Sequence, residues 1–351
     1  MNTMASRRCQ FLPEWTPQSG VMLTWPHDAS DWAPLLDRVE PVYREIAREV
    51  LYREGLLIVA RDKAHRRHIE AVLGEDDGMD LSGIRWAYAP SNDSWARDHG
   101  PITVRDEHGR LRLLDFRFNG WGGKYAHDLD NAINARLAEQ KCFTPPLQAV
   151  ELVLEGGSLE VDSHGTLLTT AQCLLMPHRN PGLSREAIEA ALIEHLCLER
   201  VLWLEHGHLA GDDTDAHIDT LARFCSDDTI AYMSCEDPAD EHYAPLRAME
   251  QELAALRTRD GRPYRLVPLP MPAPIRNAAG DRLPASYANF LIINDAVLAP
   301  VYRDANDTRV LAALDGAFPN HEVIGIDCRA LIEQYGSLHC ITMQLPEGVL
   351  R

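Results

Sequence analysis

The sequence predicts a mixed α/β protein, and three observations support this fold class. Short apolar or alternating runs that are typical of strands follow longer runs with helical spacing of apolar residues, from one end of the chain to the other. With 351 residues, 45% of them hydrophobic, the chain can bury a large core. No long linker rich in glycine, serine or proline separates two halves. We therefore expect a single domain over residues 1–351.

The predicted strands are apolar or alternating runs bounded by turn residues. They cover residues 55–60, 84–89, 111–116, 150–154, 159–170, 200–204, 229–233, 287–299, 322–326 and 337–345. The predicted helices show apolar residues at intervals of three and four. They cover residues 35–53, 64–73, 129–139, 184–197, 241–257 and 306–317. Ser184 and Asp307 are expected to cap the helices that they begin. The proline-dense segment 263–284 is expected to be an ordered surface loop.

Composition disfavours several classes of partner. The formal net charge of −19 disfavours nucleic acid and anionic membranes, because both attract a positive surface. No stretch of about 18 apolar residues and no secretory leader pattern is found, so we expect a soluble, cytoplasmic protein. The eight cysteines include no Cys-x-x-Cys pair, which argues against a zinc ribbon and a compact disulfide framework. Most of them are expected to be buried in a reducing compartment.

The segment 211–219 has the highest density of chemical groups, because it sets one histidine, His217, among four aspartates. If this segment is extended, the side chains of His217 and Asp219 point to the same face and converge on one ligand. Such a pair suits a cation, organic or metallic. The alternative is a solvated acidic loop, to which Asp212, Asp213 and Asp215 would belong.

Cys340 lies in an apolar, strand-like run that follows a glycine turn, with polar residues interleaved. A cysteine in a strand is most often a small buried hydrophobic residue. A strand end after a glycine turn can also expose a side chain at a cleft. A thiol, a histidine and several carboxylates together indicate nucleophilic attack on a cationic carbon.

Three further segments carry candidate site residues. Segment 91–101 offers the aromatic wall of Trp95 and the carboxylate of Asp98, although Arg97 could pair with Asp98 and make the group structural. Segment 118–125, with Trp121, is aromatic and rich in glycine and suits a mobile lid or a wall that faces a cation. Glu155 ends an apolar strand at a double glycine, where a buried carboxylate needs a cationic partner.

Taken together, residues 95–101, 118–125, 155–158, 211–219 and 336–342 resemble the agmatine deiminase family, in the bacterial branch related to peptidylarginine deiminases. The resemblance runs from about Pro13 to the C-terminus. It implies the pentein fold, a five-bladed α/β propeller with pseudo-fivefold symmetry and a central active site. One departure is visible at residues 335–340, which read Tyr-Gly-Ser-Leu-His-Cys, whereas many agmatine deiminases have Gly-Gly-Gly-Asn-Ile-His-Cys.

The resemblance also implies roles for individual residues. Cys340 matches the nucleophile, and His217 matches the general acid and base. The carboxylates expected around the guanidinium are Asp98, Glu155 and Asp219. The residues expected to bind the rest of the substrate are Asp213, Trp95 and Trp121, together with Asp98 and Asp219. Neither a metal nor an organic cofactor is expected.

The implied function is hydrolysis of agmatine to N-carbamoylputrescine and ammonia through a covalent thiouronium on Cys340, a step in putrescine and polyamine biosynthesis. The cationic guanidino substrate is the expected partner, and a homodimer is a further expectation. Deimination of arginine or peptidyl arginine by the same chemistry is the first alternative. A metal-dependent hydrolase using His217 and Asp219, and a propeller scaffold without activity, are the alternatives from other classes.

Overall fold

The computed structural model describes residues 9–75 and 78–351. The strands are β1 (Gln10–Phe11), β2 (Gln18–Thr24), β3 (Gly55–Ala60), β4 (Ile84–Tyr88), β5 (Ile102–Arg105), β6 (Leu111–Arg117), β7 (Leu147–Val153), β8 (Glu160–Val161), β9 (Thr166–Thr170), β10 (Arg200–Leu204), β11 (Ala222–Ser226), β12 (Thr229–Ser234), β13 (Arg265–Pro270), β14 (Leu291–Ile293), β15 (Ala296–Val301), β16 (Glu322–Asp327) and β17 (Thr342–Pro346). The predicted mixed α/β class is confirmed.

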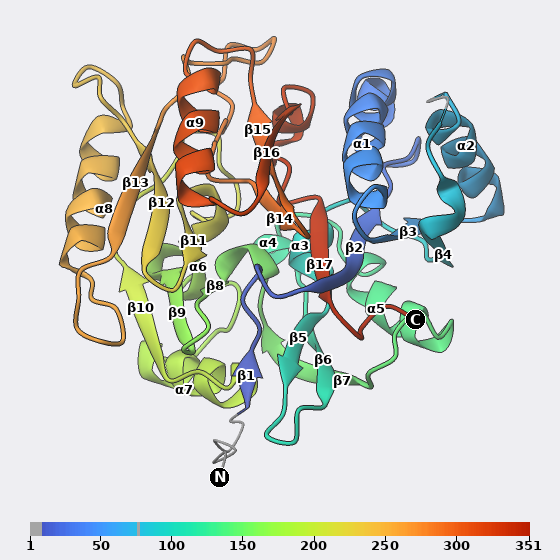
Figure 1. Cartoon of the computed structure of the whole chain (residues 1–351), viewed down its shortest axis with the longest axis horizontal. Helices are drawn as coiled ribbons and strands as arrows, with labels where there is room; N and C mark the ends of the chain where they lie inside the picture. Colours follow the sequence, from blue (N-terminus) through green and yellow to red (C-terminus); the bar gives the residue numbers. More distant parts are fainter. Residues whose placement is uncertain (1–8, 76–77) are drawn as a thin grey trace.

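The helices alternate with these strands. The α-helices are α1 (Leu36–Leu51), α2 (Lys63–Leu73), α3 (Ala96–His99), α4 (Gly120–Gly123), α5 (Ile133–Glu139), α6 (Ala171–Leu174), α7 (Arg185–Leu196), α8 (Tyr243–Ala255) and α9 (Asp307–Ala317). Three short 3-10 turns matter for the site: η4 (Gly156–Ser158), η5 (Ile218–Thr220) and η6 (Leu331–Gln334). In the view of Figure 1, the long helices α1, α2, α8 and α9 lie at the periphery, and the short helices α3 and α4 lie toward the middle.

Within the described residues, the strands form five small sheets. Their orders are β1-β5-β6-β7, β10-β9-β8, β11-β12-β13, β14-β15-β16 and β17-β2-β3-β4. The last strand, β17, pairs antiparallel with β2 near the start of the chain, with Thr342 opposite Leu23. The two ends of the chain therefore complete one sheet.

Most of the predicted strands form, but β1, β2, β5 and β11 were not predicted, and the strand expected at 337–345 begins only at Thr342. Three further expectations were wrong. The expected strands 159–170 and 287–299 are each interrupted by a turn, so each is a pair of antiparallel strands, β8 with β9 and β14 with β15. Segment 263–284, expected to be a loop, contains strand β13, which pairs parallel with β12. Proline is compatible with β13 because this strand lies at the edge of its sheet.

The helix predictions were confirmed with small changes at the ends. The Ser184 side chain caps α7 by accepting a hydrogen bond from the backbone N–H of Ala187 (3.3 Å). The expected cap at Asp307 was wrong, because Asn306 holds the cap position and Asp307 is the first helical residue. The Asp307 carboxylate instead accepts a hydrogen bond from the Tyr287 hydroxyl.

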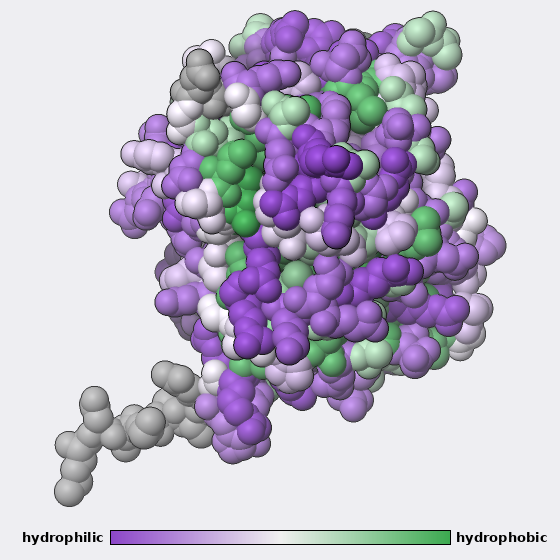
Figure 2. All heavy atoms as spheres, turned by 90° about the vertical axis from the view of Figure 1, so that its right-hand side faces the viewer, coloured by the Kyte–Doolittle hydropathy of each residue, from purple (hydrophilic) through white to green (hydrophobic). Residues whose placement is uncertain are grey.

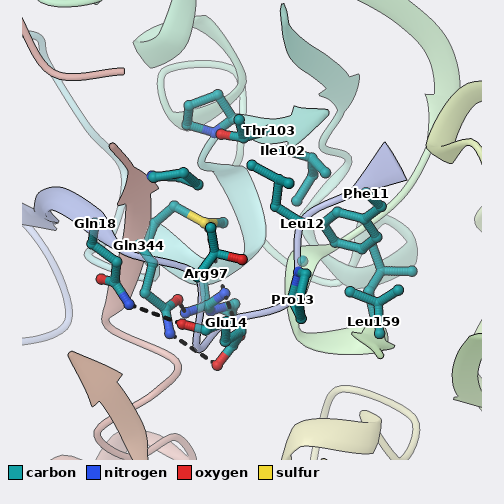
Figure 3. Close-up of a pocket in the computed structure, with 16 residues that line it drawn as sticks. Phe11, Leu12, Pro13, Glu14, Gln18, Arg97, Ile102, Thr103, Leu159 and Gln344 are labelled. Atoms are coloured by element: carbon teal, nitrogen blue, oxygen red, sulfur yellow. Dashed lines mark hydrogen bonds and ion pairs between the residues drawn. The ribbon is translucent and has the colours of Figure 1, made fainter. Parts of the chain in front are cut away.

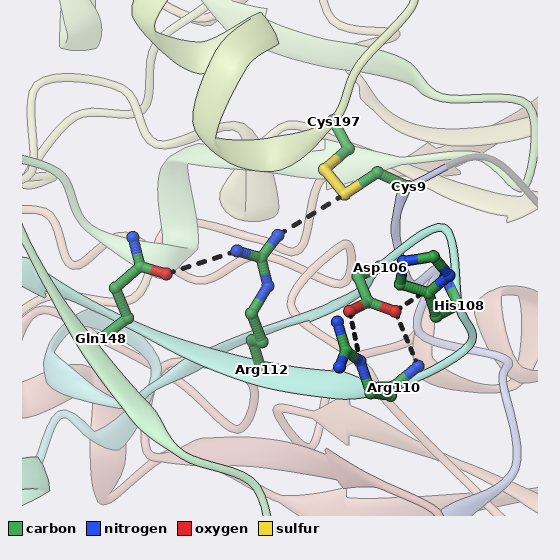
Figure 4. The surroundings of a disulfide bond; sticks show 7 residues. All are labelled: Cys9, Asp106, His108, Arg110, Arg112, Gln148 and Cys197. Atoms are coloured by element: carbon green, nitrogen blue, oxygen red, sulfur yellow. Dashed lines mark hydrogen bonds and ion pairs between the residues drawn. A yellow bond between two sulfur atoms is a disulfide. The ribbon is translucent and has the colours of Figure 1, made fainter.

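The expectation about cysteines was wrong at one pair. Cys9 and Cys197 form a disulfide that joins the segment before β1 to the residue that ends α7 (Figure 4). Cys197 has a left-handed backbone conformation (φ 59°) and caps the C-terminal end of α7. The other six cysteines are free and buried, as expected for most of them.

No helix in the described ranges is long and apolar enough to cross a membrane. Hydrophilic side chains predominate on the face drawn in Figure 2, where hydrophobic residues form small separate groups.

Candidate active site

The thiol of Cys340 lies just before strand β17 and not within it, which corrects the expected strand 337–345. Its sulfur is 3.3 Å from Oδ1 of Asn289 and 3.8 Å from Oδ2 of Asp219. The turn that leads to it is close-packed, because a Cβ added at Gly336 would lie 2.2 Å from the Trp95 ring. Cys340 is 6% exposed and lines a cavity, so its thiol lies at the floor of a pocket and not on an open surface.

His217 stands immediately before the 3-10 turn η5, which carries Asp219. The extended segment expected here was therefore wrong, but the turn still brings the two side chains to one centre. A Cβ added at Gly157 would lie 2.5 Å from Nδ1 of His217, 2.8 Å from Oδ1 of Asp98 and 3.2 Å from Oδ2 of Asp219. These three atoms thus converge on the space that the missing side chain of Gly157 leaves open.

Each carboxylate at this centre is oriented by a neighbour. Asp98 accepts hydrogen bonds from the Trp121 indole N–H (2.9 Å) and from the backbone N–H of Gly157 (3.0 Å). Oδ2 of Asp219 is 2.8 Å from Nδ1 of His339, whereas its buried Oδ1 has no protein hydrogen-bond partner among the described residues. This unpaired acceptor is suited to an N–H of a guanidinium.

Glu155 lies behind His217 and is fully buried. Its two oxygens accept from Nε of Arg179 at 2.9 and 2.8 Å, and its Oε2 is 3.9 Å from Nε2 of His217. Arg179 is thus the cationic partner that a buried glutamate requires. The same guanidinium contacts Asp215 (2.7 Å), so that aspartate belongs to a structural ion pair.

A cavity opens above Cys340, and it contains most of the residues that the sequence singled out. It is lined by Asp31, Asp93, Trp95, Asp98, Trp121, Tyr125, Asp213, Thr214, Gln334, Tyr335, Gly336 and Cys340. His217, Asp219 and Glu155 are not part of this lining and lie beneath it. Four aspartates and no lysine, arginine or histidine line the cavity among the described residues, so it is suited to a cation.

Asp213 lies at the cavity wall, where its carboxylate accepts a hydrogen bond from the Tyr125 hydroxyl (2.8 Å). Burial raises its pKa. Lys124, from the same loop as Tyr125, donates to the backbone carbonyl of Asp213 (2.6 Å) and pairs with Asp215 (2.9 Å). The aromatic loop 118–125 is therefore tied to the acidic segment 211–219.

The electrostatics of the centre favour a protonated imidazole and a neutral thiol before any ligand binds. Burial, followed by Asp219 and Asp98, raises the pKa of Cys340 well above its usual value. Burial lowers the pKa of His217, but Asp98, Cys173 and Glu155 outweigh it and raise that pKa well above the usual range. Burial also raises the pKa of Asp98 to about 6.

Two clusters of the described residues have the ligand types of a metal site: Glu155 with Cys173 and His217, and Glu14 with Glu160 and His339. In both, guanidinium groups already occupy the carboxylates. Arg179 holds Glu155, and Arg223 contacts both Glu14 and Glu160. A dication would have to displace these cations, so the donor sets fit a metal poorly.

Sequence reasoning missed Asn289 and Arg179, which support the site. Asn289 accepts from the backbone N–H of His339 (2.9 Å) and contacts the sulfur of Cys340. The sequence signal that could have identified Asn289 is the presence of a polar asparagine within the apolar run 287–299. Arg97 pairs with Glu14 (3.0 Å), so the pairing with Asp98 considered from the sequence does not occur.

A buried thiol, an imidazole and two carboxylates beneath an acidic cavity define an α/β enzyme that modifies a guanidino group. The chain matches the model of the Porphyromonas-type peptidyl-arginine deiminase family over residues 10–346, and it belongs to this family. The resemblance to the agmatine deiminase family is confirmed, because the chain is similar to a curated agmatine deiminase of Stutzerimonas stutzeri. The two sequences are 33% identical over 377 residues, and the match covers 100% of each chain.

Solved structures of related proteins share the fold. A Porphyromonas gingivalis protein provisionally named an arginine deiminase is 52% identical, with a TM-score of 0.92 and coverage of 98% of this chain and 100% of its own. A C. jejuni agmatine deiminase, crystallised as a cysteine-to-serine variant with substrate bound, is 39% identical. Its TM-score is 0.89, and the match covers 98% of this chain and 97% of the C. jejuni chain. The protein is therefore a hydrolase that acts on the C–N bond of a guanidino group.

Proposed function

We propose that the protein is an agmatine deiminase, which hydrolyses agmatine to N-carbamoylputrescine and ammonia. The observation that carries this proposal is the acidic cavity above Cys340. Agmatine has a cation at each end. The guanidinium would bind Asp98 and Asp219 beside the sulfur, and the distant amine would be held at the wall by Asp213. Trp95 and Trp121 would enclose the chain between these two ends.

The proposed reaction begins with the substrate charge. A neutral thiol attacks a guanidinium too slowly, and the surrounding carboxylates oppose ionisation of Cys340. A bound guanidinium reverses this local field and lowers the thiol pKa. The resulting thiolate attacks the central carbon, which Asp98 and Asp219 hold near the sulfur.

His217 then completes two proton transfers. As an imidazolium it protonates one nitrogen of the tetrahedral adduct, the C–N bond breaks, and ammonia leaves a thiouronium on Cys340. The neutral imidazole next takes a proton from water, whose oxygen attacks the thiouronium carbon. The C–S bond breaks, the thiolate is restored, the hydroxyl proton of the adduct passes to solvent, and the ureido product leaves. Nδ1 of His217 faces the centre and is suited to these proton transfers, while Glu155 lies near Nε2 on the other side of the imidazole ring.

Deimination of arginine is the second candidate, because the Porphyromonas gingivalis relative carries that provisional name. The carboxylate of free arginine would require a cation in the cavity. The described lining residues include none, and Lys124 is engaged by Asp213 and Asp215. This charge pattern supports an amine and disfavours a carboxylate.

We further infer that the five sheets are the blades of a five-bladed propeller formed by one catalytic domain. The support is the pairing of the last strand with β2, which joins the chain ends into one blade. Residues 1–8 and 76–77 of the expected domain 1–351 lie outside the described residues. The cytoplasmic location, the homodimer and the absence of nucleic-acid and membrane partners stay predictions.

The test is to incubate the purified protein with agmatine, arginine and a blocked arginine peptide, and to measure ammonia and ureido product. We expect turnover of agmatine alone and none with Cys340→Ala. Turnover of arginine or of the peptide in place of agmatine would contradict the proposed substrate and leave the chemistry intact. A folded protein that is silent on all three would contradict the function.

A further inference from the structure

Glu14 lies in the segment between β1 and β2, with its carboxylate beside Arg97 and Gln344 (Figure 3). One of its oxygens accepts from Nη1 of Arg97 (3.0 Å), and the other accepts from the amide of Gln344 (2.9 Å) and contacts Arg223. Its side chain is 17% exposed. A carboxylate from the start of the chain is thereby fixed among residues from three distant segments.

The same carboxylate contacts the residue that precedes the nucleophile. Oε1 of Glu14 is 2.8 Å from Nε2 of His339, and Nδ1 of His339 is 2.8 Å from Oδ2 of Asp219. His339 is fully buried between the two acids. Two hydrogen bonds to two carboxylates require two protons shared by these three groups. The orientation and charge of one group therefore depend on the other two.

Glu14, His339 and Asp219 thus form a hydrogen-bonded row, and Asp219 connects this row to the reaction. Its Oδ2 is held by His339 and lies 3.8 Å from the sulfur of Cys340, which leaves Oδ1 free for the substrate. Burial raises the pKa of Asp219, but the hydrogen bond with His339 helps to outweigh this effect and the pKa is lowered. A change at His339 would thus move or recharge the carboxylate that faces the guanidinium.

We propose that Glu14 is a positioning residue of the active site: it fixes His339, and His339 in turn holds Asp219 in place beside Cys340. This inference rests on the proposed deiminase function. Neither composition nor the spacing of motifs suggested it, because Glu14 lies 325 residues before His339.

Glu160 provides a matched control. It is another buried glutamate that contacts Arg223, but it has no hydrogen bond to His339. Burial and the charge of Glu14 raise its pKa. Glu160→Gln removes a buried acid from the same cluster and leaves the row from Glu14 to Asp219 intact. A general loss of packing around Arg223 would affect both variants alike.

The experiment compares Glu14→Gln, Glu160→Gln and His339→Asn, together with the double variant of Glu14 and His339. The asparagine amide takes the place of Nδ1 and can still donate to Asp219, but it cannot reach Glu14. Glu14→Gln should lower kcat by about 10- to 100-fold, as expected for loss of a charge-assisted hydrogen bond, whereas Glu160→Gln should stay near the wild type. In the His339→Asn background, Glu14→Gln should have no further effect.

A second readout needs no substrate. The charged or titratable groups that face Cys340 are Asp219, Asp98 and Tyr302, and those that face His339 are Arg223, Arg97, Glu14 and Asp219. In Glu14→Gln, a negative charge is lost and Asp219 is no longer fixed. Alkylation of Cys340 at neutral pH should become faster, because the thiolate fraction rises about tenfold for each unit that the thiol pKa falls. Turnover and alkylation should therefore change in opposite directions.

Three outcomes would overturn the inference. They are an equal loss of kcat in Glu14→Gln and Glu160→Gln, full additivity of Glu14→Gln and His339→Asn, and an unchanged kcat in folded Glu14→Gln. Melting temperatures identify a variant that fails to fold, and the alkylation rate then decides for the remaining variants. If the wild type hydrolyses no guanidine, the proposed function fails. The alkylation comparison still tests the coupling of Glu14 to Cys340.

Discussion

At the scale of single residues, the candidate catalytic centre depends on carboxylates that neighbouring groups hold in place. Asp98 is held by Trp121 and by the backbone of Gly157, and Asp219 is held by His339 with one oxygen unpaired. Groups fixed in this way need little rearrangement when the substrate binds. The geometry of the centre is therefore sensitive to changes of a single methyl group.

Gly157→Ala is expected to lower kcat by about 100-fold or more while the protein remains folded. The added Cβ would lie 2.5 Å from the imidazole of His217 and 2.8 Å from the carboxylate of Asp98, so both must shift. A displacement of about 1 Å can cost this much in rate. Steady-state kinetics with agmatine measure the effect.

Gly316→Ala is the matched control. Gly316 lies within α9, and a Cβ added there would meet no atom within 4 Å. This variant should keep its full activity and gain about 0.5–1 kcal/mol in free energy of unfolding, because alanine favours the helix. Equal activity of both glycine variants would refute the crowding argument.

The acid limb of the pH profile should report Asp98, whose pKa burial raises to about 6. Asp98 must be ionised to accept an N–H of the guanidinium, so kcat/KM should fall as the pH drops through about 6. Measurement of kcat/KM between pH 5 and 8 tests this. Asp98→Asn should be much slower and should lack this limb, and a flat wild-type profile down to pH 5 would contradict the assignment.

At the scale of elements, the segment that carries Glu14 is anchored by the disulfide between Cys9 and Cys197. Strand β1 has only two residues and pairs with β5, so it provides few hydrogen bonds of its own. The bond joins positions 188 residues apart, and such a cross-link restricts the unfolded chain. We therefore expect the disulfide to stabilise the fold and to take no part in the chemistry.

Cys9→Ser is expected to lower the free energy of unfolding by about 2–4 kcal/mol and to leave kcat unchanged, because neither cysteine lines the active-site cavity. Denaturant unfolding with and without a reductant measures the loss. The reductant should destabilise the wild type and have no effect on the variant. Identical stability of the two proteins under oxidising conditions would show that the bond does not form in solution.

At the scale of the whole molecule, the site combines side chains from distant parts of the chain. Asp98 comes from α3, Asp219 from η5, and Cys340 from the turn before β17. Strand β17 also completes the sheet of β2, β3 and β4. The end of the chain thus contributes both to the core and to the active site.

Deletion of residues 342–351 is expected to prevent folding, because β2 and its buried apolar residues would lose their antiparallel partner. Circular dichroism and size-exclusion chromatography should show an aggregated or unfolded product. Glu347→Ala, which changes an exposed side chain in the same segment, is the control and should fold normally. A folded, monodisperse truncated protein would contradict this role of β17.

The sequence by itself determined the mixed α/β class, most strands and helices, and the family, because these depend on local periodicity and on motifs of a few adjacent residues. It also singled out Cys340, Asp98, Trp95, Trp121 and Asp213, which the structure brings to one cavity. Local patterns failed where a turn interrupts an apolar run, as in β14 and β15, and where an edge strand tolerates proline, as in β13.

Only the tertiary structure decided how the buried charges are paired. Glu155 pairs with Arg179, and Arg97 pairs with Glu14 and not with its neighbour Asp98. The contact of Glu14 with His339, like the disulfide of Cys9 with Cys197, joins residues far apart in the chain. Burial and charge pairing depend on which segments contact one another in the folded chain, and the spacing of residues along one segment does not predict those contacts.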